Sequence, residues 1–514
     1  MSSKPVVLLP VLLLGGLAAA ISAVAVTPTA ALGQERQLGT IDFPNSGSRQ
    51  AQRPFIEGVL LLHSFEFEDA AEAFRRAQEI DPNFALAYWG EAMSYNHPLW
   101  REKDTDAAMR ALNRYAPSAD QRIAKAPTPR EKDYLRAIHT LYGQGTKTQN
   151  DRAYMAEMYR MVNTYPNDLE ARAFYALSIL GSTDGERDFA TYMRAAAAAQ
   201  PVFDDNPDHP GAAHYLIHSF DDPIHAPLGL EAARAYSEIA PGAAHAQHMT
   251  SHIFVAMGMW DDVIAANIRA RDVQNAQLEA RGRPINVCGH YTSWLHYGWL
   301  MRGDMADAER GMTDCHERVT SGTATPSDVG YFVGMRARQI LDTRDWGAAS
   351  VFAADIESPG YAFVDAYAAL MDGDRAKAES LAEGIRREVG AEAEDRSGIM
   401  MKELDALLAA HAGDGDRAIT LLREATEIEE NLPFEFGPPA SLKPPHELLG
   451  EVALDLGRHD LAISAFQKAL DFTPRRAPSL EGLAAAARAA GRTAVATAAE
   501  AQLDAIRGNR ASHN

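Results

Sequence analysis

One spacing of small, aromatic and proline residues occurs near both ends of this 514-residue chain. The intervals between its five positions are 12, 4, 3 and 5 residues in both copies, at Gly58, Ala70, Phe74, Ala77 and Pro82 and at Gly450, Ala462, Phe466, Ala469 and Pro474. Around these positions apolar residues recur at i, i+3, i+4 and i+7, which is typical of short amphipathic helices. We find no convincing period-2 pattern for strands. Such short repeated units must bury their apolar faces against one another.

This spacing resembles the tetratricopeptide repeat, in which small residues let the two helices of a pair approach and an aromatic residue wedges between repeats. Weaker copies contain only part of this five-position spacing. They occur at Gly415, Ala418, Leu422 and Ala425, at Gly373 and Ala378, and from Pro166 onward. The resemblance implies an all-α fold, a right-handed α-solenoid of helix-turn-helix repeats. It also implies a concave groove lined mainly by the first helix of each pair. We expect less than about a tenth of strand, since ordinary domains carry about 20–25%.

We expect four parts in the chain: residues 1–33 as a signal peptide or N-terminal anchor, 34–53 as a linker, 54–320 as a first repeat array, and 321–514 as a second array with a Pro-rich insertion at 431–446. Lys4 precedes a long apolar run that ends in small residues near Ala23 and Ala25, which is typical of export signals. The chain therefore resembles an exported, bacterial-type protein, periplasmic or secreted. Membrane contact is expected only if the N-terminal segment stays uncleaved as an anchor.

Charge and motifs exclude several classes of function. The formal net charge is −21, which disfavours binding to nucleic acid. The sequence has no GxxxxGK[ST] loop, GxSxG elbow, HExxH or Cys-x-x-Cys motif. The two cysteines, Cys288 and Cys315, lie on either side of a predicted turn at 302–304, so we expect their Cα atoms about 4.4–6.8 Å apart. Whether they form a disulfide or stay as buried thiols is left open.

Histidines recur in the same register as the repeats. His214 and His218 are four residues apart, and His248 and His252 repeat that pair 34 residues later, one repeat length along. Equivalent positions on adjacent repeats lie side by side, so the pairs should meet. The predicted cluster contains His214, His218, His245, His248, His252 and His290. His63 and His97 are also 34 residues apart. They can join the cluster only if the superhelix curls enough for its first repeats to face the middle ones.

Several converging imidazoles are the chemistry of a transition-metal site. Neutral imidazole binds Zn, Cu, Ni and Fe, and an i, i+4 pair can bind one ion through both rings. The sequence predicts one such ion, held either for storage and handling or as the centre of a metal-dependent enzyme. The alternative is an interaction scaffold whose groove binds a peptide or protein partner through these histidines without metal.

Polar residues near the histidines suggest supporting roles. Asn267 stands where the clear repeats have Phe74 or Phe466, and a buried amide needs a hydrogen-bonding partner. We expect Asn267 to hold a histidine from behind, as groups around metal ligands do. The candidates for a general base or a carboxylate ligand are Asp221, Asp222, Glu66 and Glu91.

Overall fold

The computed structural model describes residues 36–183, 187–390 and 393–508. The chain divides into two units, Met1–Arg36 and Gln37–Asn514, and the fold below is that of the second unit. The predicted signal peptide or anchor at 1–33 lies outside the described residues. Among the described helices, none is both long and apolar enough to cross a membrane.

The N-terminal part consists of helices joined by short turns, with one small hairpin. Its elements are α1 (Gln52–His63), α2 (Phe67–Ile80), α3 (Ala85–Met93), β1 (Asn96–His97), β2 (Glu102–Lys103), α4 (Thr105–Tyr115), α5 (Ala119–Lys125), α6 (Pro129–Leu141), α7 (Lys147–Thr164), α8 (Leu169–Gly181), α9 (Phe189–Asp205), α10 (Pro210–Phe220), α11 (Ala226–Ile239), α12 (Ala244–Ala256) and α13 (Trp260–Ala280).

The C-terminal part continues in the same way. Its elements are α14 (His290–Arg302), α15 (Met305–Thr320), α16 (Pro326–Thr343), α17 (Ala348–Val351), α18 (Pro359–Met371), α19 (Arg375–Val389), α20 (Arg396–His411), α21 (Gly415–Asn431), α22 (Pro445–Asp455), α23 (His459–Phe472), α24 (Ala477–Ala489) and α25 (Thr493–Gly508).

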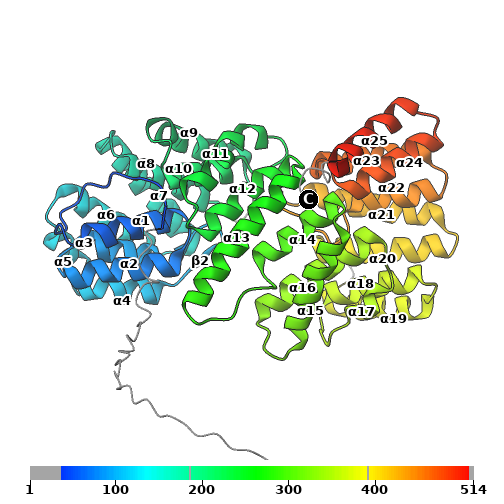
Figure 1. The fold of residues 1–514 in the computed structure, drawn as a ribbon, viewed down its shortest axis with the longest axis horizontal. Helices are drawn as coiled ribbons and strands as arrows, with labels where there is room; N and C mark the ends of the chain where they lie inside the picture. Colours follow the sequence, from blue (N-terminus) through cyan, green and yellow to red (C-terminus); the bar gives the residue numbers. More distant parts are fainter. Residues whose placement is uncertain (1–35, 184–186, 391–392, 509–514) are drawn as a thin grey trace, which may run out of the picture. The chain divides into compact units, whose positions relative to one another are not determined.

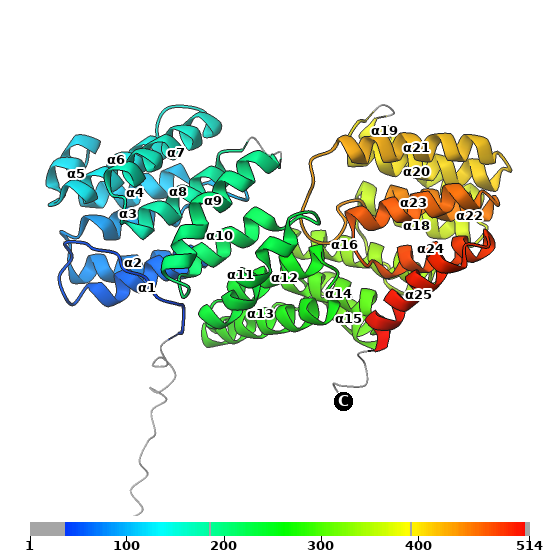
Figure 2. The same ribbon diagram turned by 90° about the horizontal axis from the view of Figure 1, so that it is seen from above.

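Neighbours in sequence are neighbours in space through most of this unit (Figures 1 and 2). Helices pack in consecutive pairs such as α1 with α2, α12 with α13 and α22 with α23, and each pair packs on the next. The prediction of an all-α solenoid of helix pairs is confirmed. In the described residues, strand is limited to the hairpin of β1 and β2, with Asn96 opposite Lys103 and His97 opposite Glu102.

In each clear copy of the repeated spacing, a phenylalanine ring packs as a wedge between two glycines on neighbouring helices. Phe74 on α2 fills the space left by Gly58 on α1 and Gly90 on α3, where added Cβ atoms would lie 2.9 and 2.3 Å from its ring. Phe466 on α23 sits in the same way against Gly450 and Gly482. Only a residue without a side chain lets the ring enter so deeply. The ring and its two glycines therefore determine how closely the first helices of successive repeats approach each other.

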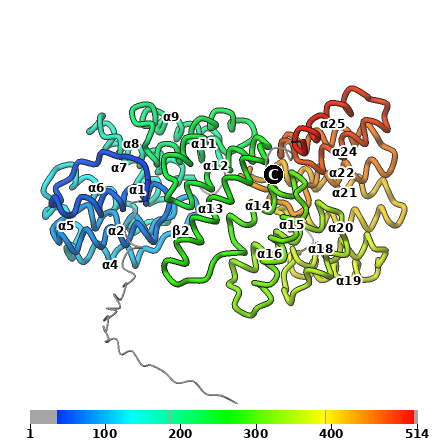
Figure 3. The backbone as a smooth tube through the Cα atoms, in the orientation of Figure 1, coloured from blue at the N-terminus to red at the C-terminus, as the bar shows by residue number. Residues whose placement is uncertain are grey.

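Two non-helical segments lie along the helices (Figure 3). The first is the described part of the predicted linker, in which the ring of Phe43 packs on Phe55, Trp89 and Tyr134. Its backbone also bonds to the middle repeats, where the Thr40 amide donates to the Asp208 carbonyl at 3.0 Å. The second segment is the Pro-rich insertion between α21 and α22. It brings Phe436 to the histidine cluster.

A disulfide joins the segment before α14 to α15. Cys288 and Cys315 are bonded, with their Cα atoms 4.6 Å apart, so the predicted bridging distance is confirmed. Because Cys288 lies two residues before His290, the bridge anchors the start of α14, which carries one histidine of the cluster.

Candidate metal centre

The clustered histidines come from α10, α12 and α14, the first helices of three consecutive pairs. Residues four apart share a helix face, so each i, i+4 pair presents two rings to the same space. The structure brings all six predicted residues together. Five are buried and His290 is partly exposed; the buried ones are His214, His218, His245, His248 and His252.

The first three-histidine group, which we call triad A, consists of His214, His218 and His245. One ring nitrogen from each lies within 4.8 Å of the others. The Nε2 atoms of all three are buried and have no hydrogen-bond partner among the described residues. Nδ1 of His214 donates to the carbonyl of His63 at 2.7 Å, which leaves a lone pair on its Nε2.

The second group, triad B, consists of His248, His252 and His290, again with ligand atoms within 4.8 Å of one another. Nδ1 of His248 lies 2.7 Å from Oδ1 of Asn267. The Asn267 amide nitrogen donates to the Val263 carbonyl at 2.8 Å, which fixes the oxygen as the atom facing the ring. The predicted contact behind a histidine is thus present, and His248 must carry its proton on Nδ1.

His252 has the same arrangement. Its Nδ1 lies 2.9 Å from Oδ2 of Asp221, a carboxylate that also pairs with Arg187. A carboxylate accepts, so Nδ1 of His252 donates and its Nε2 carries a lone pair. The Nε2 atoms of His248 and His252 are only 3.2 Å apart. Both hydrogen-bond assignments place lone pairs on these two atoms, and no proton remains to lie between them.

Two facing lone pairs at this distance repel each other unless a cation binds both. Two nitrogen ligands about 2.0–2.1 Å from a tetrahedral zinc ion are ~3.3 Å apart, which matches the observed separation. Metal-bound histidines donate their other ring N–H to a carboxylate, amide or carbonyl oxygen, and His214, His248 and His252 all do so. The cluster therefore has the geometry of a set of metal ligands.

Burial favours the neutral form of five of the six rings, the form that binds metal. Desolvation lowers the pKa of His214, His245 and His248 well below the ordinary histidine value, and neighbouring rings add to the effect. Desolvation also lowers the pKa of His252 to about 4, although Asp221 opposes it, and that of His290 to about 3.

Asp221 is a predicted acid whose carboxylate contacts the rings of triad histidines. Burial alone would raise its pKa, but Arg187 and the hydrogen bonds from His218 and His252 hold that pKa well below its usual range. Its Oδ2 lies 3.4 Å from Nδ1 of His218 as well as 2.9 Å from His252. Asp221 therefore orients rings from both triads through their Nδ1 atoms.

The other three predicted acids make different contacts. Asp222 accepts from His225 and Arg187 beyond the end of α10. Glu66 accepts the backbone N–H of His245 at 3.1 Å. Glu91 belongs to a separate ion-pair network with Arg75 and Arg114.

His63 and His97 are outside both triads. Nδ1 of His63 lies 2.8 Å from the Tyr215 hydroxyl and its Nε2 lies 2.8 Å from Glu170, so both ring nitrogens have partners. Its contribution is the backbone carbonyl that holds His214. His97 stacks on Phe67 at a centroid distance of 4.1 Å and borders the pocket described below.

Sequence reasoning missed several supporting residues. His209 and Glu170 form a buried group with His63, in which Glu170 accepts from both histidines. Arg187, on the segment before α9, neutralises Asp221. Arg187 and Asp221 are 34 residues apart, and this spacing is visible in the sequence. Without the fold, however, it does not indicate that the two side chains pair.

Aromatic rings close the side of the cluster formed by His218 and His252. Phe436 from the Pro-rich insertion lies 4.7 Å from the His252 ring and 6.0 Å from the His218 ring, measured between centroids. Trp294 on α14 stacks on His252 at 4.6 Å. This packing contributes to the burial that lowers the histidine pKa values.

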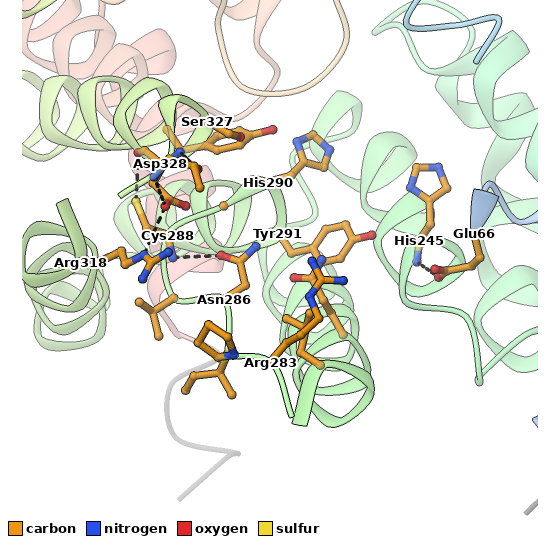
Figure 4. Close-up of a pocket in the computed structure, with 18 of the residues that line it drawn as sticks. Glu66, His245, Arg283, Asn286, Cys288, His290, Tyr291, Arg318, Ser327 and Asp328 are labelled. Atoms are coloured by element: carbon orange, nitrogen blue, oxygen red, sulfur yellow. Dashed lines mark hydrogen bonds and ion pairs between the residues drawn. The ribbon is translucent and has the colours of Figure 1, made fainter. Parts of the chain in front are cut away.

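A pocket of about 610 Å³ reaches the cluster from another side (Figure 4). It is bordered by His245 of triad A and His290 of triad B, and the aromatic residues Phe65, Trp100 and Tyr291 line it as well. This volume is in the range of small-molecule sites. One ligand from each triad is therefore next to space that a small molecule could enter.

Comparison with known proteins gives one match to a family model, Tetratricopeptide repeat, over residues 446–476. The chain carries a tetratricopeptide repeat. The matched segment spans α22 and α23, which hold the clear C-terminal copy of the spacing. A tetratricopeptide array is a scaffold that supports protein–protein interaction, through the extended surfaces that stacked repeats create. No characterised protein matches the sequence with significance.

Solved structures of low similarity include three tetratricopeptide or related chains. They are the P58(IPK) TPR domain (15% identity, 86% of this chain and 99% of that chain, TM-score 0.23), human IFIT1 crystallised as a dimer with m7Gppp-AAAA (13%, 91% and 91%, 0.34) and yeast Tom70 (11%, 91% and 100%, 0.34). Identities and TM-scores this low carry no argument about the function of this chain.

Proposed function

We propose that this protein is a tetratricopeptide scaffold that binds transition-metal ions in its six-histidine cluster. The observation that carries the proposal is the 3.2 Å separation of the His248 and His252 Nε2 atoms, each with its proton held on the opposite nitrogen by Asn267 or Asp221. Three further buried Nε2 atoms of triad A lack partners in the described residues. Metal ions would satisfy all of these lone pairs.

The donor set restricts the choice of metal. Every ligand nitrogen belongs to an imidazole, a ligand that suits Zn, Cu, Ni and Fe rather than the hard cations Mg²⁺ and Ca²⁺. The aromatic packing around His252 keeps water from that side of the cluster. The pocket at His245 and His290 leaves the other side open, as a handling site or a catalytic centre requires.

Removing the closest pair of ligands tests the proposal. The double change His248→Ala, His252→Ala should remove the ion that this pair binds and so lower the content of tightly bound Zn or Cu, measured by elemental analysis and by titration calorimetry on protein purified without affinity tag or chelator. These rings are buried between helices rather than exposed in a groove, so we expect a lower melting temperature for the variant with helical circular dichroism retained.

The matched control is His411→Ala, His459→Ala, which removes two histidines that belong to neither triad. It should bind metal as the unchanged protein does. If the unchanged protein carries no metal above background and its melting temperature does not rise on adding Zn or Cu, the metal proposal is wrong.

The tetratricopeptide repeat favours a second function, in which the pocket beside the cluster binds a segment of a protein partner without metal. Its wall combines aromatic rings with Arg283 and Asn286, groups that contact peptides well. Trp100, which is 48% exposed, would be a main contact. Under this function Trp100→Ala abolishes partner capture, and His248→Ala with His252→Ala changes neither metal content nor capture.

Our proposal also places the protein outside the cytoplasm. The disulfide of Cys288 and Cys315 supports this, because disulfides persist in oxidising compartments. Fractionation of cells that express the full chain, with mass spectrometry of the N-terminus, tests export and cleavage together. An intact N-terminus on protein found only in the cytoplasm would contradict it.

A further inference from the structure

The six histidines are more than one ion can use. Zinc and copper sites hold about four ligands, of which a site open to substrate takes three from the protein. A single ion bound by triad B would leave the buried Nε2 atoms of His214, His218 and His245 without a partner. Each triad by itself supplies three nitrogens within 4.8 Å of one another.

The two triads adjoin. The rings of His218 and His252 are 5.4 Å apart and those of His245 and His248 are 6.0 Å apart, measured between centroids. Asp221 touches Nδ1 of His218 and of His252 with the same oxygen, so one carboxylate orients one ligand of each triad. Ions held by the two triads would therefore be close neighbours in one cavity.

The charges of the cavity point to an additional ligand. Histidine binds a metal ion as the neutral imidazole, so two divalent ions would bring four positive charges into a buried space. The carboxylate of Asp221 is already engaged by Arg187 and by the Nδ1 side of His252, and that of Glu66 accepts the backbone N–H of His245. A small anion between the ions would balance part of this charge.

The pocket provides the route for that anion. It is bordered by His245 and His290, which are members of different triads and come from α12 and α14 (Figure 4). A molecule entering here reaches both triads at once. The rings of Phe436 and Trp294 cover the cluster at His252.

We propose that the cluster is a dinuclear centre, with one transition-metal ion held by each triad and a small bridging anion, such as hydroxide or azide, bound from the pocket side. This inference rests on the proposed metal-binding function and adds to it the number of ions, their division between the triads and the class of the fourth ligand of each ion. The centre shares no residue with the tetratricopeptide match at 446–476.

Copper loading with electron paramagnetic resonance tests the inference. The full chain is purified without tag or chelator, loaded with Cu(II) and freed of excess metal, and its copper and unpaired spins are counted. We expect two Cu per chain and a signal from much less than two spins, because a hydroxide bridge couples the two spins antiferromagnetically. Added azide should produce a new ligand-to-copper absorption band.

Single substitutions assign the ions to the triads. His245→Ala and His290→Ala should each retain one Cu per chain with a signal of about one spin, since each change removes a ligand from one triad only. His97→Ala is the matched control, because His97 borders the same pocket but belongs to neither triad. It should keep two coupled Cu ions. Circular dichroism measures whether each variant folds. The copper and spin counts of the unchanged chain test the inference even if a variant does not fold.

The outcomes separate this inference from the function on which it rests. One Cu per chain that is lost in the His248→Ala, His252→Ala variant overturns the dinuclear centre and leaves metal binding in place. Two Cu per chain with two uncoupled spins overturns the bridge. No bound Cu in the unchanged chain overturns both proposals.

Discussion

A single amide decides how His248 faces the cluster. Asn267 occupies the place that a phenylalanine wedge has in the clear repeats, and its oxygen fixes the proton of His248 on Nδ1. The carbonyl of His63 does the same for His214, and Asp221 does it for His252. At the scale of residues, the site therefore consists of histidines and of the oxygen atoms that select their tautomers.

Replacing this amide by leucine should weaken metal binding while keeping the fold. In Asn267→Leu the side chain keeps four non-hydrogen atoms branched at Cγ, and a weaker copy of the repeat already has Leu422 at this place. Loss of an oriented partner behind a ligand lowers metal affinity by about 10–100-fold. Competition with a chromophoric chelator would measure the affinity for zinc.

The control for this experiment is Gln339→Leu. Gln339 makes the same kind of amide contact with His296, at 2.9 Å, outside the two triads. Its replacement should leave zinc affinity unchanged. Equal losses in the two variants would mean that Asn267 acts only through general stability.

Glu403 should make the protein less stable as pH rises. Its carboxylate is fully buried and neither oxygen has a partner in the described residues, and burial, with Glu429, Glu447 and Glu451 nearby and Lys443 opposing them, raises its pKa well above the ordinary value. An acid with a raised folded-state pKa contributes stability below its unfolded pKa of about 4.3 and loses it as pH rises toward the folded value. Glu403→Gln should therefore stabilise the protein at pH 8, by roughly 1–3 kcal/mol, and much less at pH 4.5.

Glu447→Gln is the opposing control in the same chemical denaturation series. Arg476 and Lys443 outweigh the effect of burial and hold the pKa of Glu447 well below its usual range. Its stabilising contribution is present above the unfolded pKa and is lost as pH falls, so removing the charge should destabilise the protein at pH 8. A Glu403→Gln variant that is also less stable at pH 8 would contradict our account of the unpaired carboxyl.

At the scale of elements, the helix pairs depend on glycines that accept a ring. Gly482→Ala should destabilise the protein by about 1–3 kcal/mol, because the new Cβ would lie 2.2 Å from the Phe466 ring in a packed interface. Gly384→Ala on α19 provides the contrast, since nothing lies within 4 Å of its added Cβ. That change should stabilise the helix by about 0.5–1 kcal/mol. Thermal unfolding of the two variants should shift in opposite directions.

At the scale of the whole repeat unit, one buried arginine connects helices distant in sequence. Arg476, just before α24, contacts Glu447 on α22 and Asp342 on α16, and its side chain approaches Tyr297 on α14. These contacts pack the last repeats against the helices that follow the histidine cluster. Pairing is what makes the burial of all three charges tolerable.

Arg476→Met should cost about 3–5 kcal/mol, because it leaves the buried Asp342 carboxylate without this partner and removes one of the two cations that pair with Glu447. Urea unfolding measures the loss. Arg492→Met removes an exposed ion pair with Asp460 and should cost less than about 1 kcal/mol. Similar losses of unfolding free energy in both variants would show that the buried contacts of Arg476 contribute no more stability than an exposed ion pair.

The sequence predicted the helical architecture because its periodicity is local. Wedge residues such as Phe74 and Phe466, with their partner glycines, act within one or two repeats, so their spacing can be read directly along the chain. The same register predicted that the two i, i+4 histidine pairs lie on adjacent helices. Equivalent positions of stacked repeats must be neighbours, whatever the rest of the chain does.

Only the tertiary structure decided how the six histidines divide into two triads and which atoms hold them. The His63 carbonyl reaches His214 across 151 residues, Arg187 comes from the segment before α9, and Phe436 comes from the Pro-rich insertion. Such contacts have no periodic signal, because they depend on the paths of non-helical segments and on the angle between repeats. Periodicity therefore determined the scaffold and the histidine register, while long-range packing determined the tautomers, the burial and the open side of the site.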